Sequence, residues 1–176
     1  LQEDGWYLRQ DIIWNKPNPM PESVQDRCTK SHEYIFLLSK SKKYYFDNES
    51  IKEQGSGRIG GNVKPQKAYH PQRLLDAQQK IYEKVNKRSV WTVTTKPYKE
   101  AHFATYPPDL IEPCILAGCP EDGNVLDPFG GAGTTGLVSD RLRRNATLIE
   151  LNKSYADITE KRLRNDNSLF LDLEIT

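Results

Sequence analysis

One glycine-rich segment constrains the fold of this chain more than any other feature. Residues 127–136 read Asp-Pro-Phe-Gly-Gly-Ala-Gly-Thr-Thr-Gly, and they follow the short apolar stretch 124–127. Glycines at such a point allow a tight turn and let a ligand approach bare backbone at the start of a helix. The segment therefore predicts a strand, a ligand-binding loop and a helix, in that order.

The sequence after the loop continues this alternation. We expect a helix over 134–142, a strand over 146–150, and a helix over 154–163 that Asn152 caps. A strand–loop–helix–strand–helix order is typical of a right-handed βαβ unit in a parallel sheet. The predicted fold class is therefore α/β, with a Rossmann-like sheet.

The sequence before the loop predicts mainly extended structure. We expect strands over 7–14, 33–38 and 90–94, with 44–46 extending the second strand or starting a short partner strand. Residues 47–68 contain glycine clusters and are expected to be irregular, whereas 72–87 fit a polar helix. Pro108 and Asp109 are expected to open a helix that ends near Gly118.

Two carboxylates beside the loop indicate its ligand. The glycines from 131 to 136 match the GxGxxG spacing of a dinucleotide fingerprint. Asp127, however, would repel the pyrophosphate of NAD and attract an ammonium group instead. Glu150 can accept hydrogen bonds from both hydroxyls of a ribose. An amino acid joined to a ribonucleoside satisfies both acids, which favours S-adenosylmethionine and leaves an NAD-binding domain as an alternative.

Length and composition exclude several classes of protein. The 176 residues suffice for one domain, and no apolar run approaches the roughly 20 residues of a membrane span. Three cysteines without a Cys-x-x-Cys pair favour neither a disulfide framework nor a zinc site, and they fit a reducing, cytoplasmic setting. The first residues contain neither Met nor a secretory signal, so we expect the chain to begin inside a longer protein.

The charges are distributed unevenly along the chain. Residues 52–100 hold eleven basic and four acidic side chains, net +7, whereas 1–51 carry net −1 and 101–176 carry net −5. Phosphate binding depends mainly on Lys and Arg, so the middle segment is a candidate contact for a polyanion. A solvated loop with excess charge is the alternative.

Three motifs together resemble the N4-cytosine/N6-adenine amino-methyltransferases of DNA. The glycine segment is similar to the cofactor motif of that family. Residues 102–111, His-Phe-Ala-Thr-Tyr-Pro-Pro-Asp-Leu-Ile, resemble the segment that packs beside the cofactor. Residues 13–21, with Asp26-Arg27 and 32–35, resemble the hairpin and loop next to the target-base pocket. The motifs cover most of residues 6–163, and a cofactor motif near the C-terminus is the arrangement of the permuted group.

The resemblance implies a methyltransferase fold and an activity on DNA. It implies one domain over 1–176 with a target-recognition insert at 47–90. The parent enzyme would transfer a methyl group from S-adenosylmethionine to an exocyclic amino group of a flipped base in double-stranded DNA. The target, cytosine N4 or adenine N6, stays open with a slight lean to cytosine. A restriction-endonuclease counterpart would be a natural partner, and the oligomeric state stays open.

The motifs assign residues to two sites. In the cofactor site, Asp127 would bind the ammonium and Glu150 the ribose of the methyl donor. The other expected cofactor contacts are Phe103, Ala104, Phe129, Gly130, Gly131, Gly133, Thr134 and Thr135. The expected DNA contacts are Lys16, Asn18, Arg27, Arg58, Lys64, Lys67 and Arg73.

The catalytic motif of the family, Asp/Ser/Asn-Pro-Pro-aromatic, does not occur in residues 1–176. Residues 106–109, Tyr-Pro-Pro-Asp, have the reverse order and match the packing segment instead. In the permuted group the motif precedes Trp14, so we expect it upstream of residue 1 and assign no catalytic residue here. The sheet should then be incomplete at its N-terminal side, and a non-catalytic remnant is the alternative function.

Cys114 follows Pro113 and so resembles the Pro-Cys nucleophile of cytosine C5-methyltransferases. Those enzymes place the pair after the cofactor motif, whereas here it comes before. Apolar residues at 110, 111 and 115 surround it in a predicted helix. We therefore expect Cys114 to be a buried structural cysteine.

Overall fold

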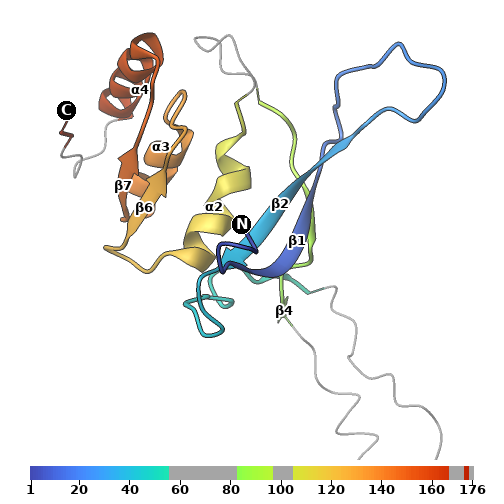
Figure 1. Ribbon diagram of the computed structural model, residues 1–176, viewed down its shortest axis with the longest axis horizontal. Coiled ribbons are helices and arrows are strands. Elements are labelled where there is room, and N and C mark those ends of the chain that lie inside the picture. The colour runs from blue at the N-terminus through green and yellow to red at the C-terminus, as the bar shows by residue number, and fades with distance from the viewer. Residues whose placement is uncertain (56–82, 97–104, 167–172, 175–176) are drawn as a thin grey trace, which may run out of the picture.

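The first sheet is built from the N-terminal hairpin. The computed structural model describes residues 1–55, 83–96, 105–166 and 173–174 (Figure 1). Strand β1 (Tyr7–Asn15) pairs antiparallel with β2 (His32–Ser39) and parallel with β5 (Val90–Thr92), as the β-branched and aromatic residues predict. β1 ends at Asn15 because the following segment has prolines at 17, 19 and 21, which cannot donate to a ladder.

One face of this sheet is buried and the other is open. Ile12, Trp14 and Trp91 form a core cluster with Leu110. On the opposite face, Phe36 keeps 56% of its surface exposed, and Tyr34 stacks against it with ring centroids 6.0 Å apart. The strands alternate their side chains between faces, so the cover on one face leaves the other face apolar and uncovered in the described part of the chain.

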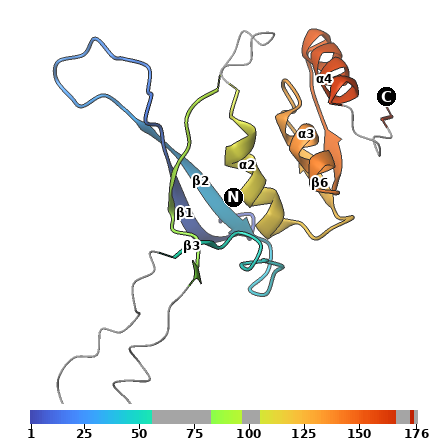
Figure 2. The same cartoon turned by 180° about the vertical axis from the view of Figure 1, so that it is seen from behind.

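Helix α2 (Pro108–Gly118) supplies that cover and connects the two halves of the molecule (Figure 2). It starts after Pro107, which is extended and fully buried, and Pro108 is tolerated because the first helical N–H needs no partner. Leu110 packs in the first cluster, whereas Ile115 packs with Cys119 and Val138 in a second one.

The C-terminal half confirms the predicted βαβ unit. Strand β6 (Asn124–Asp127) leads through the glycine loop into α3 (Thr134–Arg141), and β7 (Asn145–Leu148) lies parallel to β6. Helix α4 (Lys153–Asn165) follows, and the Asn152 side chain accepts a hydrogen bond from the Ser154 amide as the predicted cap.

Two predictions for the N-terminal half are wrong. Residues 44–46 form no strand, because β2 ends at Ser39 opposite Tyr7, where β1 begins and offers no further partner. The helix predicted over 72–87 fails at its end, since β4 (Lys84–Val85) pairs with β3 (Glu53–Gln54). Residues 72–82 of that helix lie outside the described residues.

The sheet of β6 and β7 stays separate from the sheet of β1, β2 and β5. Among the described strands, β6 pairs with β7 alone. Its other edge is therefore open in the part of the chain that the structure describes. No helix within the described ranges is long and apolar enough to cross a membrane.

Candidate cofactor site

The glycine loop crosses the carboxyl ends of two neighbouring parallel strands. The Gly130 amide donates to the Ile149 carbonyl over 2.8 Å, so the loop returns to the end of β7. Gly131 and Gly133 have φ of 53° and 74°, the left-handed region that suits glycine, and Gly133 is the N-cap of α3. The loop thus presents bare backbone at the start of a helix.

Close packing fixes this loop against α4 and β7. A Cβ added to Gly133 would lie 2.5 Å from Thr159 Cγ2, and one on Gly136 would lie 2.8 Å from Leu148 Cδ1. Thr159 also donates its hydroxyl to the Gly131 carbonyl over 2.8 Å. Glycine is required here both for the backbone conformation and for space.

Replacing Gly133 by alanine is expected to destabilise the protein. The positive φ and the contact with Thr159 should together lower the free energy of unfolding by about 1–3 kcal/mol. Gly118→Ala is the matched control, because an added Cβ there meets nothing within 4 Å. Denaturant unfolding measures both, and equal stability of the two variants would contradict the packing argument.

Asp127 stands where β6 passes into the loop, and its carboxylate is held from several sides. Oδ1 accepts a hydrogen bond from the Phe129 amide at 3.0 Å. Oδ2 accepts one from the Tyr106 hydroxyl at 3.1 Å and one from the Thr135 hydroxyl. The carboxylate therefore has a defined orientation next to the start of α3.

Glu150 occupies the corresponding place two residues after β7. Its Oε2 accepts a hydrogen bond from the Gly131 amide at 2.8 Å, and Oε1 accepts one from the Asn152 amide at 2.8 Å. The Ile149 amide donates to the Asp127 carbonyl over 2.9 Å, which keeps the two strand ends in register. Asp127 and Glu150 thus flank one loop, as the sequence predicts.

Helix α4 contributes residues that the sequence analysis missed. One guanidinium nitrogen of Arg162 donates to the Ala132 carbonyl at 2.8 Å and to the Thr134 hydroxyl at 3.0 Å. Arg162 and Thr159 lie three residues apart, on one face of the helix. Both contacts join segments about 30 residues apart along the chain, so they depend on how α4 packs against the loop and no local sequence pattern identifies them.

The other expected cofactor contacts differ in their surroundings. Phe129 is 86% exposed at the tip of the loop. Thr134 and Thr135 are buried; the Thr134 hydroxyl oxygen accepts a hydrogen bond from Arg162, and the Thr135 hydroxyl donates one to Asp127. Phe103 and Ala104 lie outside the described residues.

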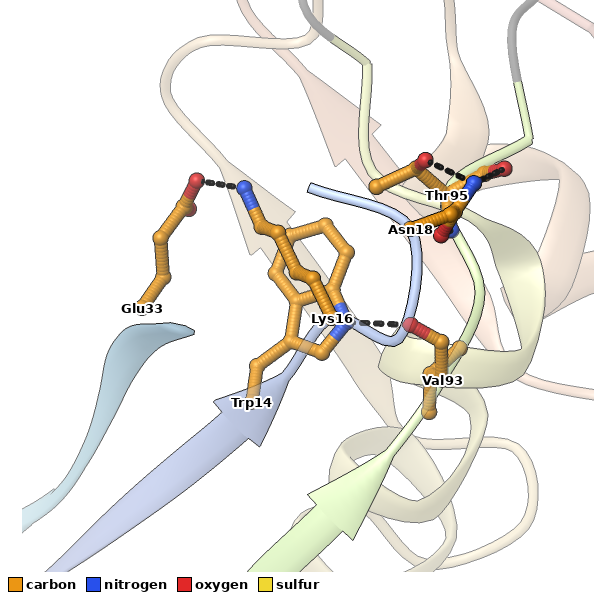
Figure 3. Close-up of polar contacts among 6 residues, drawn as sticks. All are labelled: Trp14, Lys16, Asn18, Glu33, Val93 and Thr95. Carbon is orange, nitrogen blue, oxygen red and sulfur yellow. Dashed lines mark hydrogen bonds and ion pairs between the residues drawn. The ribbon is translucent and has the colours of Figure 1, made fainter. Parts of the chain in front are cut away.

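Lys16 and Asn18 follow β1 and bind neighbouring protein groups (Figure 3). The Lys16 ammonium pairs with Glu33 and lies 4.4 Å from the centre of the Trp14 ring. Asn18 exchanges hydrogen bonds with Thr95, accepting from its amide at 3.1 Å and donating to its hydroxyl at 2.8 Å. Lys16 therefore holds the loop after β1 against β2, and Asn18 holds it against the segment after β5.

The remaining expected DNA contacts are less constrained. Arg27 exposes 61% of its side chain and lies 3.6 Å from both Glu22 and Asp26. Arg58, Lys64, Lys67 and Arg73 lie outside the described residues. A role in DNA binding stays a prediction for all of these side chains.

Cys114 has the surroundings of a structural cysteine. Its thiol sits in α2 at hydrogen-bond distance of the Leu110 carbonyl, with Sγ and O 3.7 Å apart. Burial raises its pKa from the ordinary 9.0 to about 11, which disfavours the nucleophilic thiolate. Cys28 and Cys119 are also free, and the described residues contain no cluster of side chains that could hold a metal ion.

The raised pKa of Cys114 predicts a loss of stability in alkali. The unfolded chain releases the thiol proton above pH 9, whereas the folded chain keeps it to about pH 11, so ionisation favours unfolding between these values. The free energy of unfolding should fall by up to about 2–3 kcal/mol across that window. Cys114→Ala should remove this part of the pH dependence and exposed Cys28→Ala should keep it; identical profiles would contradict the assignment.

The chain is similar in sequence to known DNA methylases. A family model described as DNA methylase, for the N6/N4 methyltransferases, matches residues 1–161. The type II methyltransferase M.SmaI of Serratia marcescens is 50% identical over 93% of this chain, and M.Cfr9I of Citrobacter freundii is 47% identical over 96%. The chain spans about half the length of these relatives, 48% of each.

The fold is also similar to that of solved structures. The M1.HpyAVI–SAM complex superimposes with a TM-score of 0.60, at 28% identity, over 93% of this chain and 65% of that one. The cytosine-N4-specific PvuII DNA methyltransferase gives a TM-score of 0.65 over 99% of this chain and 55% of that one, at 20% identity, and shows a shared fold.

Proposed function

The chain belongs to the N6/N4 DNA methylase family, and from that premise we propose that it binds S-adenosylmethionine for methyl transfer to an exocyclic amino group of a DNA base. The observation that carries the proposal is the position of Asp127 and Glu150. The two acids follow adjacent parallel strands and flank one glycine loop. NAD would bring its pyrophosphate to that loop, beside the Asp127 carboxylate, which repels it.

The polar groups of the site match the separate parts of S-adenosylmethionine. Asp127 offers a fixed carboxylate for the ammonium of the methionine moiety. Glu150 uses each oxygen once for a backbone amide, and the lone pairs that stay free can accept ribose hydroxyls. The bare backbone at Gly131 and Gly133 lets the body of the cofactor come close. When bound, S-adenosylmethionine supplies an electrophilic methyl group on a sulfonium.

The DNA side of the proposal rests on charge and on the loop after β1. The segment 47–90 would form the target-recognition insert, and residues 52–100 carry net +7. The loop after β1 would lie next to the flipped base, held in place by the contacts between Asn18 and Thr95. Arg27, with 61% of its side chain exposed, is an expected phosphate contact.

The target amino group would be bound by an Asp/Ser/Asn-Pro-Pro-aromatic motif outside residues 1–176, because no such motif occurs within them. Two features support a sheet that is incomplete on its N-terminal side. The edge of β6 is open among the described strands, and Phe36 and Val90 are exposed on a sheet face without cover. As in the relatives named type II methyltransferases, we propose a cytoplasmic restriction-modification setting with an endonuclease counterpart.

Product analysis tests the proposed function. The natural protein that contains residues 1–176 is incubated with mixed-sequence duplex DNA and S-adenosylmethionine labelled in its methyl group, and the DNA is digested to nucleosides. We expect label in N4-methyldeoxycytidine or N6-methyldeoxyadenosine, which also identifies the target base. Label in 5-methyldeoxycytidine would contradict the proposal. Cofactor binding without any transfer would favour the non-catalytic alternative.

A further inference from the structure

Tyr106 reaches the cofactor site from outside the βαβ unit. Its hydroxyl lies 3.1 Å from Asp127 Oδ2 and is in hydrogen-bond contact with the Thr135 hydroxyl. Asp127 is 21 residues away along the chain and Thr135 is 29 away. The contact therefore joins the segment before α2 to the end of β6 and the first turn of α3.

The ring of Tyr106 is fixed by the other half of the molecule. It packs against the cluster of Ile12, Trp14, Trp91 and Leu110, which belongs to the first sheet and α2. The next residue, Pro107, is fully buried and restricts the backbone that carries the ring. Because the ring is held in this way, its hydroxyl has a fixed position next to Asp127 Oδ2.

The hydroxyl stays a neutral donor under ordinary conditions. Burial is the main cause that raises the pKa of Tyr106 from 10.0 to about 12, and the nearby charge of Asp127 acts in the same direction. The proton therefore remains available to the Asp127 carboxylate near neutral pH. Thr135 donates to the same carboxylate oxygen, so the pair of hydroxyls fixes Oδ2 while the Phe129 amide fixes Oδ1.

We propose that Tyr106 is a positioning residue for the cofactor, whose hydroxyl orients the Asp127 carboxylate toward the ammonium group of the methyl donor. The inference rests on the proposed function, because it needs S-adenosylmethionine at this loop. Tyr106 itself would not contact the reacting methyl group. It would act through Asp127, and the fixed packing of its ring would make the first sheet part of the cofactor site.

Tyr106→Phe removes the hydroxyl and keeps the ring that packs in the core. The carboxylate then keeps the Thr135 hydroxyl and the Phe129 amide but loses one of its three donors, so its orientation is less restricted. We expect affinity for S-adenosylmethionine to fall about three- to tenfold, less than for direct loss of a charged partner. Tyr45→Phe is the matched control, since Tyr45 is 48% exposed and does not belong to the cluster against which Tyr106 packs.

Binding of two ligands, and a variant that combines two substitutions, distinguish a role of Tyr106 in positioning Asp127 from a general role in stabilising the fold. Titration calorimetry on the natural protein that contains residues 1–176 compares S-adenosylmethionine with 5′-methylthioadenosine, which lacks the amino-acid part. The Tyr106→Phe effect should appear with S-adenosylmethionine alone. It should also vanish in an Asp127→Ala background, because a residue that acts through Asp127 has nothing left to position.

Any other outcome contradicts either the role of Tyr106 or the proposed function, and the two cases can be told apart. Equal weakening of both ligands, loss of binding of both, or unchanged affinity for S-adenosylmethionine in Tyr106→Phe would overturn the role of Tyr106. An additive effect in the Asp127→Ala background would overturn it as well. Failure of the unaltered protein to bind S-adenosylmethionine would instead contradict the proposed function.

Discussion

Asp127→Ala and Glu150→Ala are each expected to weaken S-adenosylmethionine binding about ten- to a hundredfold. The reason is the loss of charge-assisted hydrogen bonds to the ligand, which typically contribute about 1.5–3 kcal/mol each. Titration calorimetry on the natural protein that contains residues 1–176 measures the affinity directly. Glu121→Ala is the control, because Glu121 is an exposed acid shortly before β6 and away from the loop.

The two variants should differ in which ligand they lose. Asp127→Ala should spare 5′-methylthioadenosine, which has no ammonium group, whereas Glu150→Ala should weaken both ligands, since both carry the ribose. Glu150 also accepts the Gly131 and Asn152 amides, so part of its effect will come from a less ordered loop. Unchanged affinity in both variants would contradict the assignment of the site, and tight NAD binding would revive the dinucleotide alternative.

Methyl transfer to DNA is expected to be undetectable with residues 1–176 alone. The proposed site for the methyl donor and the loop after β1 lie within residues 1–176, but this sequence contains no Asp/Ser/Asn-Pro-Pro-aromatic motif to hold the target amine. Without that motif no aligned nucleophile meets the methyl group, and alignment can account for about 7–11 kcal/mol of a barrier. Transfer of labelled methyl groups to mixed-sequence DNA measures the activity, with M.SmaI as the positive control for the DNA substrate.

Robust turnover by the purified 176 residues would contradict this prediction and direct attention to residues 106–109. Their geometry supports a packing role instead. The Tyr106 hydroxyl binds Asp127 and Thr135, Pro107 is fully buried, and Pro108 is the first residue of α2. None of these groups is free to hold a base amine in the structure described here.

The C-terminal half follows from local sequence signals. The glycine loop after β6, the positive φ at Gly131 and Gly133, and the Asn152 cap are properties of short segments, so pattern and spacing predict them. The two acids at the strand ends follow in turn, because parallel neighbours bring their carboxyl ends to one edge. For these reasons the loop and its two carboxylates could be found without the structure.

Contacts between distant segments could not be found in this way. The hydrogen bond from Tyr106 to Asp127 and the one from Arg162 to Ala132 depend on how separate elements pack together. The same holds for β4, where pairing with β3 overrides a weak helical pattern. Lys16 shows the limit most clearly, since a lysine in a proline-rich loop suggests phosphate binding, whereas here its ammonium pairs with Glu33.

The most direct test of the cofactor site is a crystal structure of the natural protein that contains residues 1–176, grown with S-adenosylmethionine. We expect density for the cofactor on the loop between β6 and α3, with the methionine ammonium at the Asp127 carboxylate and the ribose hydroxyls at Glu150. Cofactor density away from this loop would contradict this expectation. So would density on the loop in the reverse orientation, with the ribose at Asp127.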